Sequence, residues 1–186
     1  MTGRLFDDTV GVLSGWKASS DEAELARMRT LELLADGPAA MTRAHRAGHV
    51  TASTLVVGAD RRMLLCLHGR MNAWMQLGGH CESDDPTLAA AALREATEES
   101  GIEGLKLDPE PIDVHIHPVR CKTSDGEPAT DTFHFDVRFV AVAPPGATEQ
   151  VSAESQALGW FTAETLPTPL ADGVHPLIAP ALRRLR

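Results

Sequence analysis

The stretch LREATEESGI, residues 93–102, gathers three glutamates within five positions and ends at a glycine. The residues before it offer Asp85 as a helix N-cap, a proline at the first helical position and then an alanine-rich run. Gly101 is typical of the residue that closes a helix. Side chains three and four positions apart share a helix face, so the three carboxylates are expected to project from one side. They belong to Glu95, Glu98 and Glu99.

Neighbouring like charges destabilise a helix by roughly 0.2–0.5 kcal/mol per pair, so this face needs compensation. A hard divalent cation is one explanation, and a solvated acidic face with Arg94 reaching Glu98 is the alternative. The preceding segment WMQLGGHCESDD, residues 74–85, favours the cation. Its Gly78-Gly79 pair, read as a turn, would let backbone carbonyls approach an ion closely.

Residues 79–102 resemble the signature of the Nudix hydrolases, a glycine followed by an acidic residue and then by Arg-Glu-x-x-Glu-Glu-x-Gly-aliphatic. The second half, REATEESGI, matches at every defined position. In the first half the acidic residue is Asp85, an aspartate, and one more residue than usual separates it from Arg94. We interpret the difference as one extra residue at the start of the helix.

The resemblance implies an α/β fold, a Nudix-type α/β/α sandwich with a mixed sheet, over residues 49–186. Residues 1–48 form an N-terminal helical extension and linker, expected to pack on the domain or to mediate a homodimer contact. Residues from 49 onward are expected to fold without it. The implied activity is a metal-dependent pyrophosphohydrolase that cleaves the diphosphate of a nucleoside diphosphate linked to another group.

The resemblance also implies roles for individual residues. Mg²⁺ or Mn²⁺ would be held by the Gly79 carbonyl and by Glu95, Glu98 and Glu99. Arg94 would orient the glutamates by charge-assisted hydrogen bonds. The general base would be a glutamate of the signature or, on a later loop, Glu154.

Substrate contacts are assigned to Arg70, Trp74 and His80. Aromatic residues make up only 4% of the chain, and tyrosine is absent, so few platforms for a base exist. Trp74 could serve as a platform or belong to the core. Three phenylalanines alternate at strand period, which favours the core. They are Phe133, Phe135 and Phe139.

A second candidate metal site lies outside the signature. In DVHIHPV and FHFDVRF, residues 113–119 and 133–139, alternate polar side chains share a strand face, and a hairpin would bring the two faces together. The proposed ligands of a transition metal are His49, His80, His134 and Asp136. The alternative is that these residues are solvent-facing positions of an antiparallel sheet or substrate contacts.

Two other functions are open. Isopentenyl-diphosphate isomerase shares the Nudix fold and holds a metal with histidines and glutamates. Its signature is degraded, whereas Glu95, Glu98 and Glu99 are all present here. A ligand-binding regulator built on a Nudix domain need not keep the metal glutamates. Metal-dependent turnover discriminates a hydrolase from both.

Composition excludes some partners. The net charge of −9 and the lack of Lys/Arg clusters argue against nucleic acid, and no apolar run approaches the length that spans a bilayer. The Nudix resemblance implies that the partner is a small nucleotide-type molecule. The chain shows no signal-peptide pattern and carries an odd, scattered set of cysteines, which favours the cytoplasm. The cysteines are Cys66, Cys81 and Cys121.

Hydrophobic periodicity predicts the remaining elements. A helix begins at a Ser19–Glu22 capping box and presents Leu25, Met28 and Leu31 to one side. An Asp125-Gly126 turn joins two of the expected strands. Strands are expected over residues 49–58, 62–69, 111–119 and 132–143. A short strand that ends in a turn is expected over residues 157–167, and a last helix over residues 175–186.

Overall fold

The computed structural model describes residues 2–122, 128–151 and 155–185. Its helices are α1 Thr2–Gly15, α2 Asp21–Leu34, the short 3₁₀ helix η1 Pro38–Met41, α3 Leu88–Ser100 and α4 Val174–Arg184. Its strands are β1 His49–Val57, β2 Met63–His68, β3 Ala73–Met75, β4 Leu77–His80, β5 Lys106–Leu107, β6 Asp113–Cys121, β7 Thr130–Val142 and β8 Ser155–Phe161. No helix in these ranges combines the length and apolarity needed to cross a bilayer.

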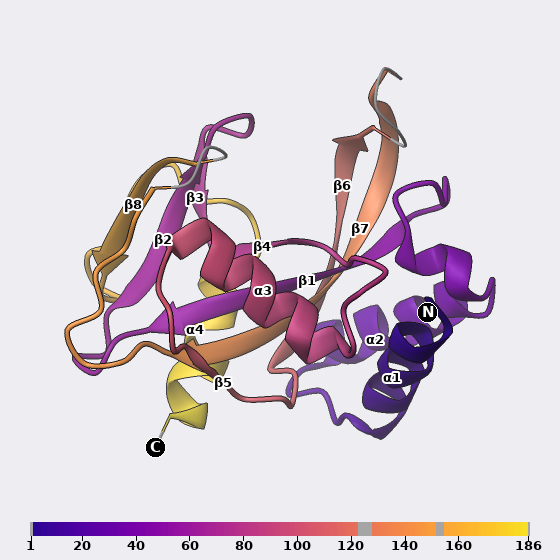
Figure 1. Cartoon of the computed structure of the whole chain (residues 1–186), viewed down its shortest axis with the longest axis horizontal. Coiled ribbons are helices and arrows are strands. Elements are labelled where there is room, and N and C mark those ends of the chain that lie inside the picture. The colour runs from indigo at the N-terminus through magenta and orange to yellow at the C-terminus, as the bar shows by residue number, and fades with distance from the viewer. Residues whose placement is uncertain (1, 123–127, 152–154, 186) are drawn as a thin grey trace.

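A mixed sheet forms the centre of the molecule (Figure 1). Strand β1 pairs in parallel with β7 from His49↔His134 to Val57↔Val142. Its other edge pairs antiparallel with β4 near its start and with β2 near its end. Strand β6 forms a long antiparallel pair with β7, while β8 and β3 extend the sheet beyond β2. The strand pairs of β1, β2, β6, β7 and β8 confirm the expected strands.

Helices cover both faces of this sheet. Val56 of β1 shares a core with Ala96 of α3, whereas Leu55 shares a core with Val174 and Leu177 of α4 on the opposite face. Because successive strand residues point to opposite faces, one apolar strand supports both layers. Figure 1 shows α3 in front of the sheet and α4 behind it. The expected α/β/α sandwich is confirmed.

The N-terminal helices complete the core around the start of α3. Leu5 and Leu13 of α1 are buried in the same cluster as Leu88 of α3 and Val50 of β1. The backbone N–H of Leu88 donates to the Asp8 carboxylate at 2.8 Å. The extension therefore helps to hold the helix that carries the glutamates.

The start of α3 differs from the expected one. Thr87 is the N-cap, and its hydroxyl accepts from the N–H of Ala90 at 3.1 Å. Asp85 is not the cap, because its carboxylate is used by Arg94 instead. The expected closure at Gly101 is confirmed, since this residue has a left-handed φ of 67° and its N–H donates to Thr97.

The prediction of which face of α2 is buried was wrong. The cap is Ser20 rather than Ser19, and Leu25 and Met28 are 58% and 57% exposed. Another face of the helix is buried instead, and Leu31 is only partly buried against the core. The buried residues are Ala23, Ala26, Thr30, Leu33 and Leu34.

Two further expectations need correction. Gly78 and Gly79 lie in strand β4 rather than in a turn, and a Cβ at Gly78 would lie only 2.4 Å from that of Ser53 on β1. The alternation of phenylalanines holds for buried Phe139 but not for Phe133, which is 46% exposed near the far end of the β6–β7 pair. The expected Asp125-Gly126 turn lies outside the described residues.

Candidate functional site

The acidic face of α3 lies against strand β4. A Cβ added to Gly79 would lie 2.6 Å from one carboxylate oxygen of Glu95, so the missing side chain makes room for this carboxylate against the strand. Glu99 is buried, and its Oε2 accepts from the N–H of Gly78 at 2.9 Å. Gly79 therefore leaves space for Glu95, and the N–H of Gly78 binds Glu99 one helical turn further along α3.

Arg94 organises the acidic residues around it. Its Nε and Nη2 donate to the two oxygens of Asp85, each at 3.0 Å. Nη1 donates to Glu95 at 3.0 Å and to Glu98 at 3.1 Å. Nη2 also donates to the carbonyl oxygen of His80 at 2.9 Å, which ties the helix to the end of β4. The hydrogen bonds that Arg94 donates to the Asp85 carboxylate raise the pKa of Arg94, so the guanidinium stays charged.

The three glutamates do not converge on one point. Glu95 and Glu98 are held by Arg94, Glu99 is held by the backbone of Gly78, and the Glu98 side chain is 60% exposed. Among the described residues, the group of His, Cys, Asp or Glu ligand atoms that lie close enough to share one ion does not include these glutamates. The carboxylates and the neighbouring backbone still form a set of oxygen donors, which suits a hard cation such as Mg²⁺. Rotation of the exposed Glu98 side chain would be part of binding.

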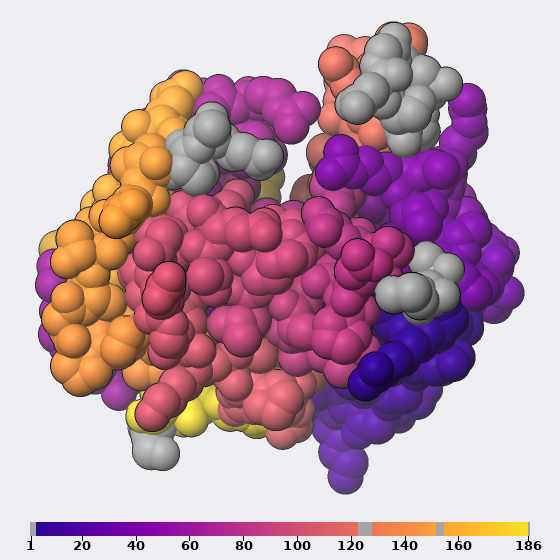
Figure 2. Space-filling view, in the orientation of Figure 1, coloured from indigo at the N-terminus to yellow at the C-terminus, as the bar shows by residue number. Residues whose placement is uncertain are grey.

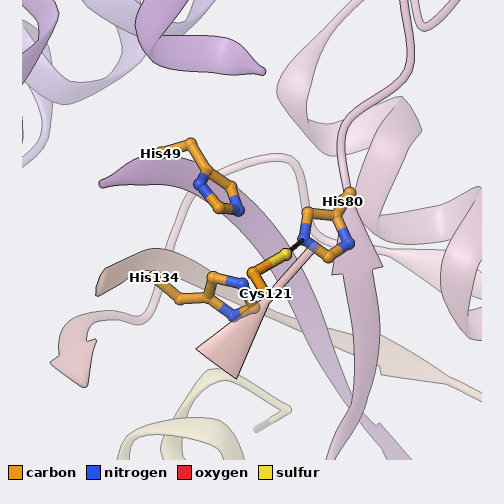
Figure 3. A group of neighbouring side chains, drawn as sticks. All are labelled: His49, His80, Cys121 and His134. Atoms are coloured by element: carbon orange, nitrogen blue, oxygen red, sulfur yellow. Dashed lines mark hydrogen bonds between the residues drawn. The ribbon is translucent and has the colours of Figure 1, made fainter. Parts of the chain in front are cut away.

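The set that does converge contains three histidines and a cysteine (Figure 3). We call it the His/Cys cluster: His49 on β1, His80 on β4, Cys121 on β6 and His134 on β7. One ligand atom from each residue lies within 4.8 Å of those of the other three. Sγ of Cys121 is 3.5 Å from Nε2 of His80, and the three ring centroids are separated by 4.8–5.1 Å.

Burial keeps these imidazoles neutral. It lowers the pKa of His49 to about 4 and the pKa values of His80 and His134 to about 3. Both ring nitrogens of His49 and Nε2 of His134 are buried without a hydrogen-bond partner among the described residues. A buried polar atom left unpaired typically costs about 1–3 kcal/mol, so these nitrogens call for a ligand.

Asp136 does not join the cluster, although the sequence pattern placed it there. Its Oδ1 accepts from Thr51 at 3.1 Å, and its Oδ2 accepts from Ser53 at 2.7 Å and from Gln76 at 3.3 Å. The buried Arg138 guanidinium adds a bond to Oδ2 at 3.3 Å. With both oxygens occupied by protein donors, this carboxylate is a structural partner of Arg138 in the structure, and Cys121 stands where Asp136 was expected.

The glutamate face and the His/Cys cluster lie on opposite faces of the sheet. Gly79 pairs with Ala52 and faces Glu95 on α3, whereas His80 pairs with Thr51 and therefore points to the other face. His49 lies two residues before Thr51 and shares its face. The two sites are separate but adjacent, since they meet at consecutive residues of β4.

The other candidate residues lie around these sites. Trp74 is partly buried, packs edge-on against Phe161 at 5.1 Å between ring centroids and lies against the core under α4. Arg70 is exposed in the turn between β2 and β3. Glu154 lies outside the described residues. Figure 2 shows the surface hollowed between this β2–β3 connection and the β6–β7 hairpin.

The family model described as NUDIX domain matches residues 47–185. The structure of a Nudix-family hydrolase from Clostridium perfringens has a TM-score of 0.55 and 24% identity, over 74% of this chain and 98% of that one. A search of curated proteins finds no match.

Two further solved structures share the fold. A MutT Nudix hydrolase from Burkholderia pseudomallei has a TM-score of 0.53 and 24% identity, over 72% of this chain and 97% of that one. An Ap4A hydrolase from C. elegans has a TM-score of 0.53 and 18% identity, over 73% of this chain and 96% of that one. At these identities the likeness shows the fold alone.

Proposed function

This chain belongs to the Nudix family, and we propose that it is a metal-dependent hydrolase that cleaves the diphosphate linkage of a nucleoside diphosphate joined to another group. The observation that carries the proposal is the carboxylate face of α3, fitted to the glycines of β4 and bound by Arg94. An acidic face that was only solvated would need neither the space that Gly79 leaves for Glu95 nor the backbone N–H of Gly78 that binds Glu99.

In this proposal the glutamates and the Gly79 carbonyl hold Mg²⁺ or Mn²⁺. When bound there, the cation would neutralise charge on the phosphate oxygens and lower the pKa of a water molecule. Glu95 and Glu99 are already fixed by Arg94 and by the Gly78 N–H. Because Glu98 is the most exposed of the three, it is the glutamate that can turn toward an arriving cation or accept a proton from water.

Arg94 acts as a positioning residue. It is anchored by Asp85 on one side and by the His80 carbonyl on the other, so its remaining N–H donors point in fixed directions at Glu95 and Glu98. Fixed carboxylates cost less to order when the cation and substrate arrive, which favours catalysis by positioning. The general base is proposed to be Glu98 or Glu154.

The proposed substrate is a small nucleotide-type molecule. One similar structure is an Ap4A hydrolase, and another is a MutT Nudix hydrolase. The β2–β3 turn lies beside the hollow of Figure 2. Arg70 is exposed in this turn and is proposed to contact a phosphate. Trp74 is not proposed as a base platform, because its ring packs on Phe161.

A substrate panel tests the proposal. The full chain is incubated with ADP-ribose, dinucleoside polyphosphates, nucleotide sugars, NADH and nucleoside triphosphates, with Mg²⁺, Mn²⁺ or a chelator. Phosphate release, after a phosphatase step where needed, reports cleavage. We expect turnover of at least one compound, abolished by the chelator and restored by excess Mg²⁺.

The same panel separates the alternative functions. Isopentenyl diphosphate is included, and its conversion without phosphate release would indicate an isomerase. Binding of a nucleotide without any turnover would indicate a regulator. Either result would replace the hydrolase proposal, as would cleavage that is unaffected by removal of divalent cations.

A further inference from the structure

We propose that the His/Cys cluster binds one Zn²⁺ ion in a closed, tetrahedral site that ties together strands β1, β4, β6 and β7. The site is distinct from the glutamate face, since it lies on the other side of the sheet. It does not depend on the proposed hydrolase function, because its ligands and its role concern the fold.

The donor set suits zinc. Three imidazoles and one thiolate form a mixed nitrogen and sulfur site, which zinc favours, whereas Mg²⁺ requires oxygen donors. The four ligands come from four different strands, so the site could not be formed by one local segment. Figure 3 shows the three rings and the Cys121 sulfur gathered around a common space.

The distances fit a tetrahedral ion. Zn–N and Zn–S bonds of ~2.0–2.1 and ~2.3 Å at a tetrahedral angle place the two ligand atoms ~3.6 Å apart. Sγ of Cys121 and Nε2 of His80 are 3.5 Å apart. The remaining ligand atoms lie within 4.8 Å, so side-chain rotation and small shifts of the rings would bring them into the same shell.

Unpaired nitrogens provide an independent observation. His49 is fully buried, and neither of its ring nitrogens has a hydrogen-bond partner in the described part of the chain. His134 has the same feature at Nε2. A buried imidazole with no polar partner is costly in the apo protein, and a metal ion satisfies one nitrogen of each ring.

The ligand set is that of a structural zinc site rather than a catalytic one. All four tetrahedral positions are supplied by the protein, which is the arrangement of structural rather than catalytic zinc. Asp136 is held by Thr51, Ser53 and Arg138, so it does not compete as a ligand. Cys121 ends β6, and the ion would therefore fix the outer part of the β6–β7 hairpin to β1 and to the end of β4.

Binding follows ordinary zinc–thiolate chemistry. The Cys121 thiol loses its proton to solvent as the Zn–S bond forms, and the neutral imidazoles donate a lone pair each. No oxidant or reductant is involved.

Metal analysis of the full chain tests the proposal. Protein is freed of metal with a strong chelator, loaded with Zn²⁺, dialysed and measured for zinc and for protein. Loading with Co²⁺ in place of Zn²⁺ gives a spectroscopic readout, because tetrahedral Co²⁺ has intense visible bands and a thiolate ligand adds a charge-transfer band in the near ultraviolet. We expect one retained zinc per chain and both cobalt signals.

Matched variants locate the ion. Loss of a residue that only hydrogen-bonds a metal ligand typically weakens metal affinity ~10- to 100-fold. Loss of a ligand itself, in Cys121→Ser or His134→Gln, should therefore weaken Zn²⁺ binding by at least ~100-fold. Cys121→Ser should also remove the thiolate band. The controls are Cys66→Ser, a buried cysteine on β2, and His175→Gln, an exposed histidine on α4, and both should behave as the wild type.

The wild-type chain alone can overturn the proposal, even if a variant fails to fold. Folded protein that retains no zinc after dialysis would contradict it, as would a Co²⁺ spectrum without a thiolate band. Zinc held equally well by folded Cys121→Ser would place the ion elsewhere and would also contradict it. A metal bound only at the glutamate face would give oxygen-ligated Co²⁺ and no sulfur signal, so this outcome is recognisable.

Discussion

Arg94 and Asp85 form a bidentate ion pair, with Nε–Oδ1 and Nη2–Oδ2 distances of 3.0 Å each. The Asp85 side chain is only 6% exposed and that of Arg94 is 22% exposed, so the pair is shielded from water. This geometry fixes the plane of the guanidinium and thereby the direction of the N–H groups that reach Glu95 and Glu98.

The first prediction concerns this pair. Asp85→Asn should lower the free energy of unfolding by roughly 1–3 kcal/mol, because a partly buried cation loses its charged acceptor. It should also reduce kcat/KM by ~10- to 100-fold, since the glutamates lose their alignment. Urea denaturation and initial rates measure the two effects. Glu82→Gln is the control, because its carboxylate is 3.8 Å from Arg94 and 65% exposed, and wild-type behaviour is expected.

The second prediction concerns the N-terminal helix. Asp8→Ala should cost about 1 kcal/mol of stability, because the first N–H of α3 at Leu88 loses its acceptor. Asp7→Ala changes an exposed neighbour on the same helix and corrects for helix propensity. Equal unfolding midpoints of the two variants would show that the contact between α1 and α3 contributes nothing.

The fold was predictable from the sequence only in part. The long alternating strands and the helix closed by Gly101 were predictable, because local pattern and burial agree there. Helix α1 was not, since Gly3, Thr9 and Gly11 weaken its propensity and its stability comes from packing Leu5 and Leu13 against distant residues. Strand β4 was read as a turn because glycine is rare in strands.

The third prediction concerns the space beside β4. A Cβ at Gly79 would lie 2.6–2.9 Å from the Glu95 carboxyl atoms, which are at the far end of a long side chain. Gly79→Ala should therefore fold with nearly wild-type stability but displace Glu95. We expect at least a ~10-fold loss of kcat/KM, consistent with an ~1 Å misplacement at a site of chemistry. Gly11→Ala, where no atom lies within 4 Å, should keep full activity. A fully active Gly79→Ala enzyme would argue against Glu95 as a ligand.

The fourth prediction concerns pH. Burial lowers the pKa of His115 to about 4, helped by the nearby Arg138 and His117 and opposed by Asp136 and Asp172. Between about pH 6.5 and pH 4 the unfolded chain binds a proton at this residue that the folded chain does not, so stability falls as pH falls. His115→Gln should show a shallower loss of unfolding free energy than the wild type between pH 6.5 and pH 5. Parallel curves for the two proteins would contradict this assignment.

The candidate sites were also predictable only in part. Glu95, Glu98, Glu99 and Arg94 are close in sequence, so helical geometry alone groups them. Cys121 was missed as a partner of His80, although it has the same strand parity as His117 and so faces the same side of β6. Its position depends on how far the β6–β7 hairpin extends, a long-range feature that the expected strand end at residue 119 cut short.

The most direct test of the central claim is the rate of diphosphate hydrolysis by Glu98→Gln, measured with saturating Mg²⁺ on the best substrate of the panel. The substitution keeps the shape of a 60% exposed side chain and removes only its charge, so folding should be unaffected. Glu103→Gln, an exposed glutamate beyond the end of α3, is the matched control. We predict at least a ~100-fold loss of kcat, about 2.7 kcal/mol of transition-state stabilisation, for Glu98→Gln and no change for Glu103→Gln. A folded Glu98→Gln protein that turns over at the wild-type rate would contradict the account.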